Sequence, residues 1–432
     1  MPCCCWRPNS SVAERPQEKA LNTNDRQRND RSPQSPARRR LFTAAAAVTG
    51  SLAAWPTLTL AGAAGPGANR LVLVILRGGL DGLGAAPALG DAEFAAARGP
   101  LGQYAAPPLR VDATFALHPS LVELHAMVGQ REAAIVHAIG LPYRERSHFD
   151  AQQVLESGGT RPYELSTGWL GRALVASGSK GLALNTTVPL VLRGRADVDT
   201  WAPSALPDPS ADLVARLERM YAGDPALATA LERARQLRAD SPMAMQDAAP
   251  AGMAANGPRP GAFLTLSRRA AEFLAQANGP QAAVLEIGGW DTHANQANPN
   301  GPLAAGLRQL DLGLAALRTG LAAGGAWQRT AVIVVSEFGR EVAVNGTLGT
   351  DHGTGGVAFV LGGAVQGGRV VADWPGLAKS QRFEGRDLRI TTDLRAVLKG
   401  VLGDHLRIAS RSLDAEVFPD SAKVKPLQLL RG

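Results

Sequence analysis

Four short motifs contain the residues whose types and spacing are suited to chemistry, and each follows an apolar run of strand length. They span residues 77–82, 146–149, 288–293 and 336–340, and the last is followed closely by residues 350–353. Carboxylate oxygens and imidazole nitrogens are side-chain donors that divalent metals bind. The motifs therefore predict a divalent-metal site, with zinc, calcium or magnesium as the ion. Its predicted ligands are Asp81, Asp291, His293, Glu337, Asp351 and His352.

Ser147 and His148 are the candidate catalytic residues. A hydroxyl at the beginning of a helix lies where the helix dipole and free N–H groups favour an anion, so Ser147 is a candidate nucleophile or metal ligand. With Asp150 three residues further on, Ser147 also fits a capping box, which requires no catalytic role. His148 is a candidate acid–base group or ligand, and Arg144 and Arg146 are candidate anion clamps.

Several of these residues have a purely structural alternative. Asp81, with glycines around it, fits either a metal ligand or an Asx-turn. Asp291 and His293 are two residues apart on a glycine-rich loop, which favours metal binding over a buried structural histidine. Arg340 is explained equally well as a salt-bridge partner. The remaining histidines, in apolar or exposed helical contexts, are interpreted as structural: His118, His125, His137 and His405.

The elements that must position these motifs can be read from hydrophobic patterning. Continuous rather than alternating apolar runs are typical of strands buried on both faces, as in a parallel sheet. Helical periodicity between the runs adds the strand–helix alternation of an α/β fold. Ligands of such sheets bind at the carboxyl ends of the strands, so we expect the motif side chains to meet at one edge. The predicted strands are residues 71–76, 133–139, 282–287, 330–335 and 357–361.

The domain organisation is predicted to be simple. Residues 1–65 are expected to be a signal peptide and linker, and residues 66–432 one α/β domain. A helical insertion is predicted at about residues 200–260, because two charged helices, at 211–221 and 225–238, precede a stretch rich in Ala, Met, Pro and Gly.

Composition argues against a nucleic-acid partner although the isoelectric point is about 9.7. Residues 1–61 carry five of the seven net positive charges, so the remainder of the chain is nearly balanced. Nucleic-acid binding driven by counterion release requires clustered basic residues, and the sequence has no basic stripe that would supply them. All three cysteines lie at positions 3–5, so a processed chain would contain no thiol for a disulfide or a thiolate metal site.

The N-terminal region has the pattern of an export signal. Arg38, Arg39 and Arg40 precede Leu41-Phe42, a mildly apolar run follows to Leu60, and small residues come next. This twin-arginine pattern predicts a periplasmic or secreted protein that engages the twin-arginine translocation machinery and has no stable membrane span after cleavage. A retained anchor is the alternative, because the run is close to the roughly 20 residues that span a bilayer.

The leader and the motifs, in this order, resemble the domain-of-unknown-function family 1501, a bacterial family of exported proteins distantly similar to the alkaline phosphatase and sulfatase superfamily. The resemblance covers about residues 38–405. It implies an α/β, alkaline-phosphatase-like fold with a mostly parallel central sheet flanked by helices, together with the helical insertion.

The resemblance also implies roles for individual residues. The positions that match are Asp81 for the first metal ligand, Ser147 for the nucleophile, Asp291 and His293 for a ligand pair, Glu337 for an acidic ligand and His352 for a last histidine. Two departures stand out: Asp291 and His293 are closer together than in the superfamily, and Phe338 replaces a histidine. They imply an incomplete second metal site, or a single bound metal.

We therefore expect an exported, metal-dependent hydrolase of phosphate or sulfate esters that acts on a small anionic ester. The competing interpretation is a non-catalytic periplasmic binding or envelope-assembly protein that retains a vestigial metal site. Nothing in the sequence identifies the substrate.

Overall fold

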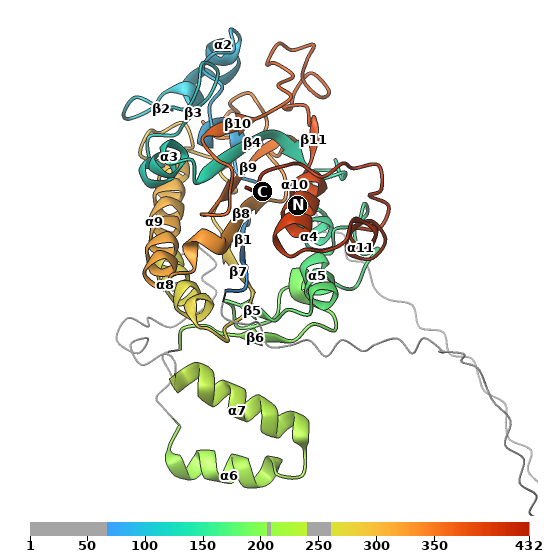
Figure 1. The fold of residues 1–432 in the computed structure, drawn as a ribbon. Helices are drawn as coiled ribbons and strands as arrows, with labels where there is room; N and C mark the ends of the chain where they lie inside the picture. The colour runs from blue at the N-terminus through green and yellow to red at the C-terminus, as the bar shows by residue number, and fades with distance from the viewer. Residues whose placement is uncertain (1–66, 205–208, 240–260, 432) are drawn as a thin grey trace, which may run out of the picture. The chain divides into compact units, whose positions relative to one another are not determined.

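A mixed, mostly parallel nine-stranded sheet forms the centre of the computed structural model, which describes residues 67–204, 209–239 and 261–431 (Figure 1). The strands lie in the order β10-β4-β9-β8-β1-β7-β5-β6, and β11 pairs with β4. Their bounds are β1 (Arg70–Leu76), β4 (Ala133–Gly140), β5 (Gly181–Ala183), β6 (Val198–Thr200), β7 (Ala282–Ile287), β8 (Thr330–Ser336), β9 (Gly356–Leu361), β10 (Arg369–Val371) and β11 (Thr392–Asp393). All five predicted strands are confirmed within this sheet, whereas β5, β6, β10 and β11 were not foreseen.

One strand departs from a purely parallel arrangement. β9 is antiparallel to β4 and to β8, while the other neighbours in the sheet are parallel. Residues 337–355 connect β8 to β9 and return to the edge that they left, so Gly356 pairs with Ile139 near the end of β4. The carboxyl ends of β1, β4, β7 and β8 and the first residue of β9 therefore share one edge of the sheet.

Apolar side chains pack on both faces of the sheet. In β1, Leu73 and Ile75 belong to one buried cluster and Val72 and Val74 to another, as the two-residue period of a strand requires. Figure 1 shows α8 and α9 side by side along one face. The cluster that contains Val72 and Val74 includes side chains of α3 (Val122–Gly129), α8 (Ala262–Ala275) and α9 (Pro302–Ala323). The cluster that contains Leu73 and Ile75 includes side chains of α4 (His148–Ser157), α5 (Trp169–Ser177) and α10 (Leu394–His405).

A small sheet and further helices complete the described part of the chain. A separate two-stranded antiparallel sheet consists of β2 (Leu109–Arg110) and β3 (Ala116–Leu117). The remaining helices are α1 (Gly82–Ala85), α2 (Phe94–Arg98), η1 (Gly99–Gly102), η2 (Leu190–Leu192), α6 (Ala211–Tyr221), α7 (Pro225–Ala239), η3 (Trp327–Arg329), α11 (Ser410–Ser412) and η4 (Leu413–Val417).

The two helices predicted within the insertion correspond to α6 and α7. The predicted export signal, the three cysteines and most of the Ala/Met/Pro/Gly-rich stretch lie outside the described residues. Among the described helices, none is both long and apolar enough to cross a bilayer.

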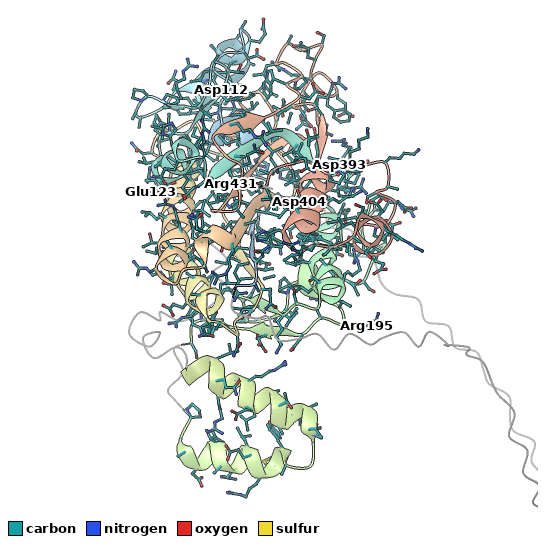
Figure 2. The ribbon with its side chains drawn as sticks, in the orientation of Figure 1. Asp112, Glu123, Arg195, Asp393, Asp404 and Arg431 are labelled. Atoms are coloured by element: carbon teal, nitrogen blue, oxygen red, sulfur yellow. The ribbon has the colours of Figure 1, made fainter. Side chains whose placement is uncertain are left out.

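Charged side chains of both signs lie on the surface around the sheet. The labels in Figure 2 mark the exposed side chains of Asp112, Glu123, Arg195, Asp404 and Arg431 and the half-buried Asp393. Asp393 begins α10 as its N-cap, because its side chain accepts a hydrogen bond from the backbone N–H of Arg395. The mixture of signs fits a body whose net charge is close to balance.

Candidate metal centre

Four ligand-type side chains meet at the carboxyl edge of the sheet. His148 begins α4 after β4, Asp291 and His293 follow β7, and His352 precedes β9. One carboxylate oxygen, Oδ1 of Asp291, lies 3.4 Å from Nε2 of His148, 3.0 Å from Nε2 of His293 and 3.2 Å from Nε2 of His352. The four side chains thus converge from three separate segments of the chain.

The histidines also lie close to one another. Nε2 of His352 is 3.1 Å from Nε2 of His148 and 3.0 Å from Nε2 of His293. His148, Asp291 and His352 form one triangle of donor atoms, and His293 forms a second triangle on the same Asp291–His352 edge. Ligand atoms of a tetrahedral zinc site are about 3.3 Å apart, given Zn–N bonds of about 2.0–2.1 Å. The observed spacing is of this size.

The other ring nitrogen of each histidine is held by an acceptor. Nδ1 of His148 is 2.8 Å from Oε1 of Glu337, and Nδ1 of His293 is 3.0 Å from Oδ1 of Asp351. Nδ1 of His352 is 2.9 Å from the carbonyl oxygen of Arg146. Since a carboxylate or carbonyl oxygen can only accept, each Nδ1 carries the proton. Carboxylate or carbonyl partners of this kind orient metal-binding histidines.

The tautomers have a consequence for the centre itself. When each ring carries its proton on Nδ1 alone, the Nε2 lone pair of His352 faces Nε2 of His148 and of His293, and all three Nε2 atoms face the Asp291 carboxylate. Four acceptors at 3.0–3.4 Å repel one another unless a cation or a bound proton lies among them. The donor set therefore fits a bound divalent ion, and three imidazoles among four donors suit zinc better than calcium or magnesium, which prefer oxygen ligands.

Electrostatics at the centre follow from the same contacts. Burial alone would lower the pKa of His148, but the hydrogen bond that His148 donates to Glu337 and the charges of Glu337 and Asp291 raise that pKa above its ordinary value. Burial lowers the pKa of His352, and the charges of His148 and Arg340 act in the same direction. Burial would raise the pKa of Glu337, yet the hydrogen bond with His148 and other donors hold that pKa below its usual range. The carboxylates are therefore anions and His352 is neutral at pH 7.

Two predicted ligands lie behind the histidines rather than at the convergence point. Oε1 of the buried Glu337 accepts from His148 Nδ1, from Gly78 N at 2.8 Å and from Gln152 Nε2 at 3.1 Å. The half-exposed Asp351 accepts from His293 Nδ1. In this geometry both carboxylates orient a histidine.

Asp81 lies elsewhere in the network. It is 1% exposed and forms an ion pair with Arg98, which is itself fully buried. Its Oδ2 also accepts a hydrogen bond from Gln296. No contact within the described chain joins Asp81 to the three histidines, so the structure does not bring it to the point where the other ligands meet.

Ser147 is the N-cap residue of α4, directly before His148, but the predicted capping box is not formed. The Ser147 side chain makes no capping hydrogen bond to the helix. Asp150 instead accepts from the hydroxyl of Tyr143 at 3.1 Å. The hydroxyl of Ser147 therefore does not cap α4, and it interacts instead with the hydroxyl of Tyr143. Arg146, predicted as an anion clamp, is paired with Glu384 and Asp387.

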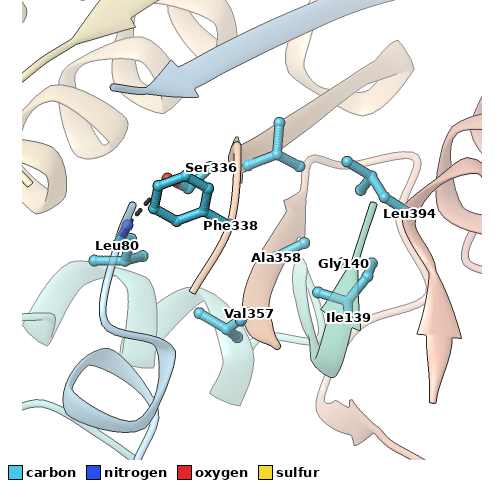
Figure 3. A pocket seen from close by; sticks show the side chains of 10 residues that line it. Leu80, Ile139, Gly140, Ser336, Phe338, Val357, Ala358 and Leu394 are labelled. Atoms are coloured by element: carbon cyan, nitrogen blue, oxygen red, sulfur yellow. Dashed lines mark hydrogen bonds between the residues drawn. The ribbon is translucent and has the colours of Figure 1, made fainter. Parts of the chain in front are cut away.

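Phe338 separates the centre from a small apolar hollow. Its ring centroid lies 4.7 Å from that of His148 and 5.2 Å from that of His352. Figure 3 shows the ring next to Ser336 at the end of β8, and the hollow is also lined by Ile139, Gly140, Val357 and Leu394 among others. Phe338 thus supports two histidines with an apolar surface and adds no ligand of its own.

Two glycines allow the ligand loops to approach one another. Gly78 has φ +123°, and a Cβ there would lie 2.7 Å from the backbone nitrogen of Asp291. A Cβ on Gly349 would lie 2.1 Å from the carbonyl oxygen of His293. Any larger residue would displace the Asp291–His293 loop.

Sequence reasoning missed the polar residues that support the ligands. Asn345 donates from Nδ2 to Oδ1 of Asp351 at 3.1 Å and to the carbonyl oxygen of His293 at 2.9 Å. Gln152 supports Glu337, and its position four residues after His148, on the same face of α4, was a readable signal. Gln296 and Asn345 lie on loops, where no periodicity indicates a side chain's direction.

Comparison with known proteins gives the family. The model of the family described as "Protein of unknown function (DUF1501)" matches residues 68–418, which contain the whole centre. No curated protein matches the sequence.

Solved structures show a distant likeness. Ps i-CgsB, solved in complex with k-i-k-neocarrahexaose, is 12% identical with a TM-score of 0.41, and the alignment covers 83% of this chain and 77% of that one. The phosphonate monoester hydrolase of Agrobacterium radiobacter is 12% identical with a TM-score of 0.38, over 79% and 74%. The lipoteichoic acid synthase LtaP from Listeria monocytogenes is 11% identical with a TM-score of 0.38, over 83% and 76%. At these values the likeness does not extend to function.

Proposed function

The chain belongs to the family of proteins of unknown function termed DUF1501. From this premise and from the geometry of the centre, we propose that the protein is a metal-dependent hydrolase of phosphate or sulfate esters. The observation that carries the proposal is the convergence of four acceptors, the Nε2 atoms of His148, His293 and His352 and the Asp291 carboxylate, at one solvent-facing point.

These four residues would hold the ion, with zinc as the best fit to the donors. When bound, a divalent ion supplies Lewis-acid stabilisation of the negative charge that an ester centre develops during substitution. The side chains of Asp291 and His293 are nearly half exposed, at 44% and 45%, so an ester in solution can reach this side of the centre.

Ser147 is the proposed nucleophile. Its hydroxyl makes no capping bond, and it lies at the N-terminus of a ten-residue helix, where the free N–H groups favour an anion. Its oxygen would attack phosphorus or sulfur and the ester alcohol would leave, with the serine proton passing to solvent. Water would then hydrolyse the covalent serine ester and restore the free hydroxyl.

A second candidate function is a non-catalytic metal-binding protein of the cell envelope. The observation that favours it is the pairing of the arginines near the centre: Arg146 with Glu384 and Asp387, and Arg340 with Asp291. Guanidinium groups neutralised in this way are less available to an anionic substrate. Turnover distinguishes the two functions.

The test combines metal content with turnover of an aryl phosphate and an aryl sulfate. The wild-type protein is expected to retain zinc through dialysis and to hydrolyse at least one ester. Asp291→Ala should lose the metal, whereas Ser147→Ala should keep the metal and lose turnover. His125→Ala is the matched control, because the His125 side chain lies on α3 and hydrogen-bonds the carbonyl oxygen of Arg110. Zinc retained without turnover of either ester class would support the binding protein instead.

A further inference from the structure

A set of buried polar side chains joins the two loops that carry most of the ligands. Oε1 of Gln296 accepts hydrogen bonds of 2.6 Å from the hydroxyls of both Thr292 and Thr350. Nε2 of Gln296 donates to Asp81, and Asp81 pairs with Arg98. All five side chains are buried, and we call these residues the brace.

The position of the two threonines gives the brace its significance. Thr292 lies between the ligands Asp291 and His293, and Thr350 comes two residues before His352. A single buried amide oxygen therefore links the two ligand loops directly beside three of the ligands. The loops also share backbone hydrogen bonds, from the N–H of Thr350 to the carbonyl oxygen of Thr292 at 3.1 Å, from Asn295 to Thr347 at 3.0 Å and from Ala297 to Leu348 at 2.9 Å. Hydrogen bonds in such a buried place are strong, and they are costly to leave unmade.

The orientation of Gln296 is determined by its partners. Both threonine hydroxyls donate to the amide oxygen, so the amide nitrogen must face Asp81, which as a carboxylate can only accept. In the opposite amide orientation the threonine hydroxyls could still accept from the amide nitrogen, but the amide oxygen would face the Asp81 carboxylate, an acceptor against an acceptor. Asp81 thus fixes which end of Gln296 faces the ligand loops.

The charge of Asp81 is balanced within the protein. Arg98 is fully buried, pairs with Asp81, and donates from Nη1 to the carbonyl oxygen of Val342 at 2.9 Å. A carboxylate whose oxygen already accepts from a guanidinium and an amide has no need of a metal ion to compensate its burial.

We propose that the brace is a positioning network for the metal centre, that Asp81 acts in it as an acceptor rather than as a metal ligand, and that the centre takes one divalent ion. The inference rests on the proposed metal centre and adds its stoichiometry and the residues that fix its loops. The ion's ligands are then limited to Asp291 and the three histidines.

The first experiment measures zinc affinity by competition with a chromophoric chelator. Thr292→Val and Thr350→Val remove a hydroxyl but keep the shape, and each is expected to weaken zinc binding about 10- to 100-fold, the usual effect of losing a supporting residue. Thr292→Ser and Thr350→Ser keep the hydroxyl and should bind zinc within about threefold of the wild type. Unfolding of the zinc-free proteins is measured alongside, to separate affinity from stability. Equal zinc affinity of the Val and Ser variants would overturn the positioning role.

The second experiment counts zinc per chain by mass spectrometry. The wild type should contain one ion. The double variant Asp81→Asn/Arg98→Met removes both charges but leaves an acceptor for Gln296, and it should still contain one ion, with a loss of affinity no larger than that of Thr292→Val or Thr350→Val. Loss of zinc from this variant, or two ions in the wild type, would overturn the inference while leaving the proposed hydrolase intact. A wild type without zinc would overturn both, and zinc without ester turnover would overturn the hydrolase alone.

Discussion

Nη2 of Arg340 donates a hydrogen bond of 2.9 Å to Oδ1 of Asp291, the same oxygen that the three histidines face. Arg340 is 1% exposed, and its Nε and Nη1 have no hydrogen-bond partner among the described residues. Burial would raise the pKa of Asp291, but Arg340 and the histidines outweigh burial and hold it below its usual range. Asp291 is therefore kept as an anion, which is the form that binds a metal.

Replacing Arg340 should weaken zinc binding most at mildly acidic pH. In Arg340→Met the pKa of Asp291 rises, so protons compete more effectively with zinc as the pH falls. We expect a loss of affinity on the order of tenfold at pH 7 and more at pH 5.5, measured by chelator competition across that range. Arg340→Lys retains a positive charge and is the matched control. An Arg340→Met protein with the wild-type affinity and pH profile would contradict this role.

The two carboxylates behind the histidines should differ in importance. Glu337 is fully buried while the side chain of Asp351 is 49% exposed, so the electrostatic effect of Glu337 on its histidine is less screened by water. Glu337→Gln removes the charge that raises the pKa of His148, and zinc affinity is expected to fall about 10- to 100-fold. Asp351→Asn should reduce zinc affinity by less. The zinc affinities of the two variants are compared by zinc titration. A larger loss of affinity in Asp351→Asn than in Glu337→Gln would show that burial does not determine which carboxylate matters more.

His137 should make the protein less stable in mild acid. It is fully buried in β4, where Nε2 bonds the carbonyl oxygen of Ala86 and Nδ1 accepts from the N–H of Ala138. Burial lowers the pKa of His137 to about 4, whereas in the unfolded chain it is near its ordinary 6.5. Between these two pKa values only the unfolded chain binds the proton. The contribution of neutral His137 to the free energy of unfolding is therefore fully present above pH 6.5 and is lost as the pH falls towards 4.

The size of this effect is about 3 kcal/mol, at about 1.4 kcal/mol for each unit of difference in pKa. The measurement is the free energy of unfolding by urea from pH 7 to pH 4.5, on zinc-free protein. His137→Gln keeps a donor for Ala86 but does not titrate, and it should show a correspondingly shallower pH dependence. If the free energy of unfolding depends on pH identically in the wild type and in His137→Gln, His137 does not contribute to the acid sensitivity.

Export is predicted to require the paired arginines of the leader. Arg39→Lys/Arg40→Lys keeps the charge but removes the twin-arginine pattern, so the protein should remain in the cytoplasm. Immunodetection in cytoplasmic and periplasmic fractions measures the outcome, with a lysine substitution at Arg38 as the control. Wild-type accumulation of the double variant in the periplasm would contradict the twin-arginine assignment.

The sheet was predictable because its strands are buried on both faces. Runs such as 71–76 and 330–335 are continuously apolar, and the structure places β1 and β8 side by side in register. The direction of β9 was not predictable, since an apolar run of that length reads alike in either direction. Its direction follows from the 337–355 connection, which does not cross the sheet and so begins β9 at the edge where β8 ends.

The centre was partly predictable for a related reason. Residues after parallel strands share an edge, which correctly indicated that His148, Asp291, His293 and His352 lie together. Sequence position does not indicate which way a loop side chain points. Glu337 directly follows β8 and lies behind His148 instead of beside it.

His148 and His352 are separated by 204 positions in the chain, yet their Nε2 atoms are 3.1 Å apart. A chain in which β4 has not yet paired with β9 cannot bring the two together, so zinc would bind only molecules whose central sheet has assembled. Each tenfold excess of free zinc over its dissociation constant would then add about 1.4 kcal/mol to the stability of the assembled state. Bound zinc would thereby distinguish molecules with an assembled sheet from those without one. Incompletely assembled chains should accumulate when the protein refolds in the presence of a chelator.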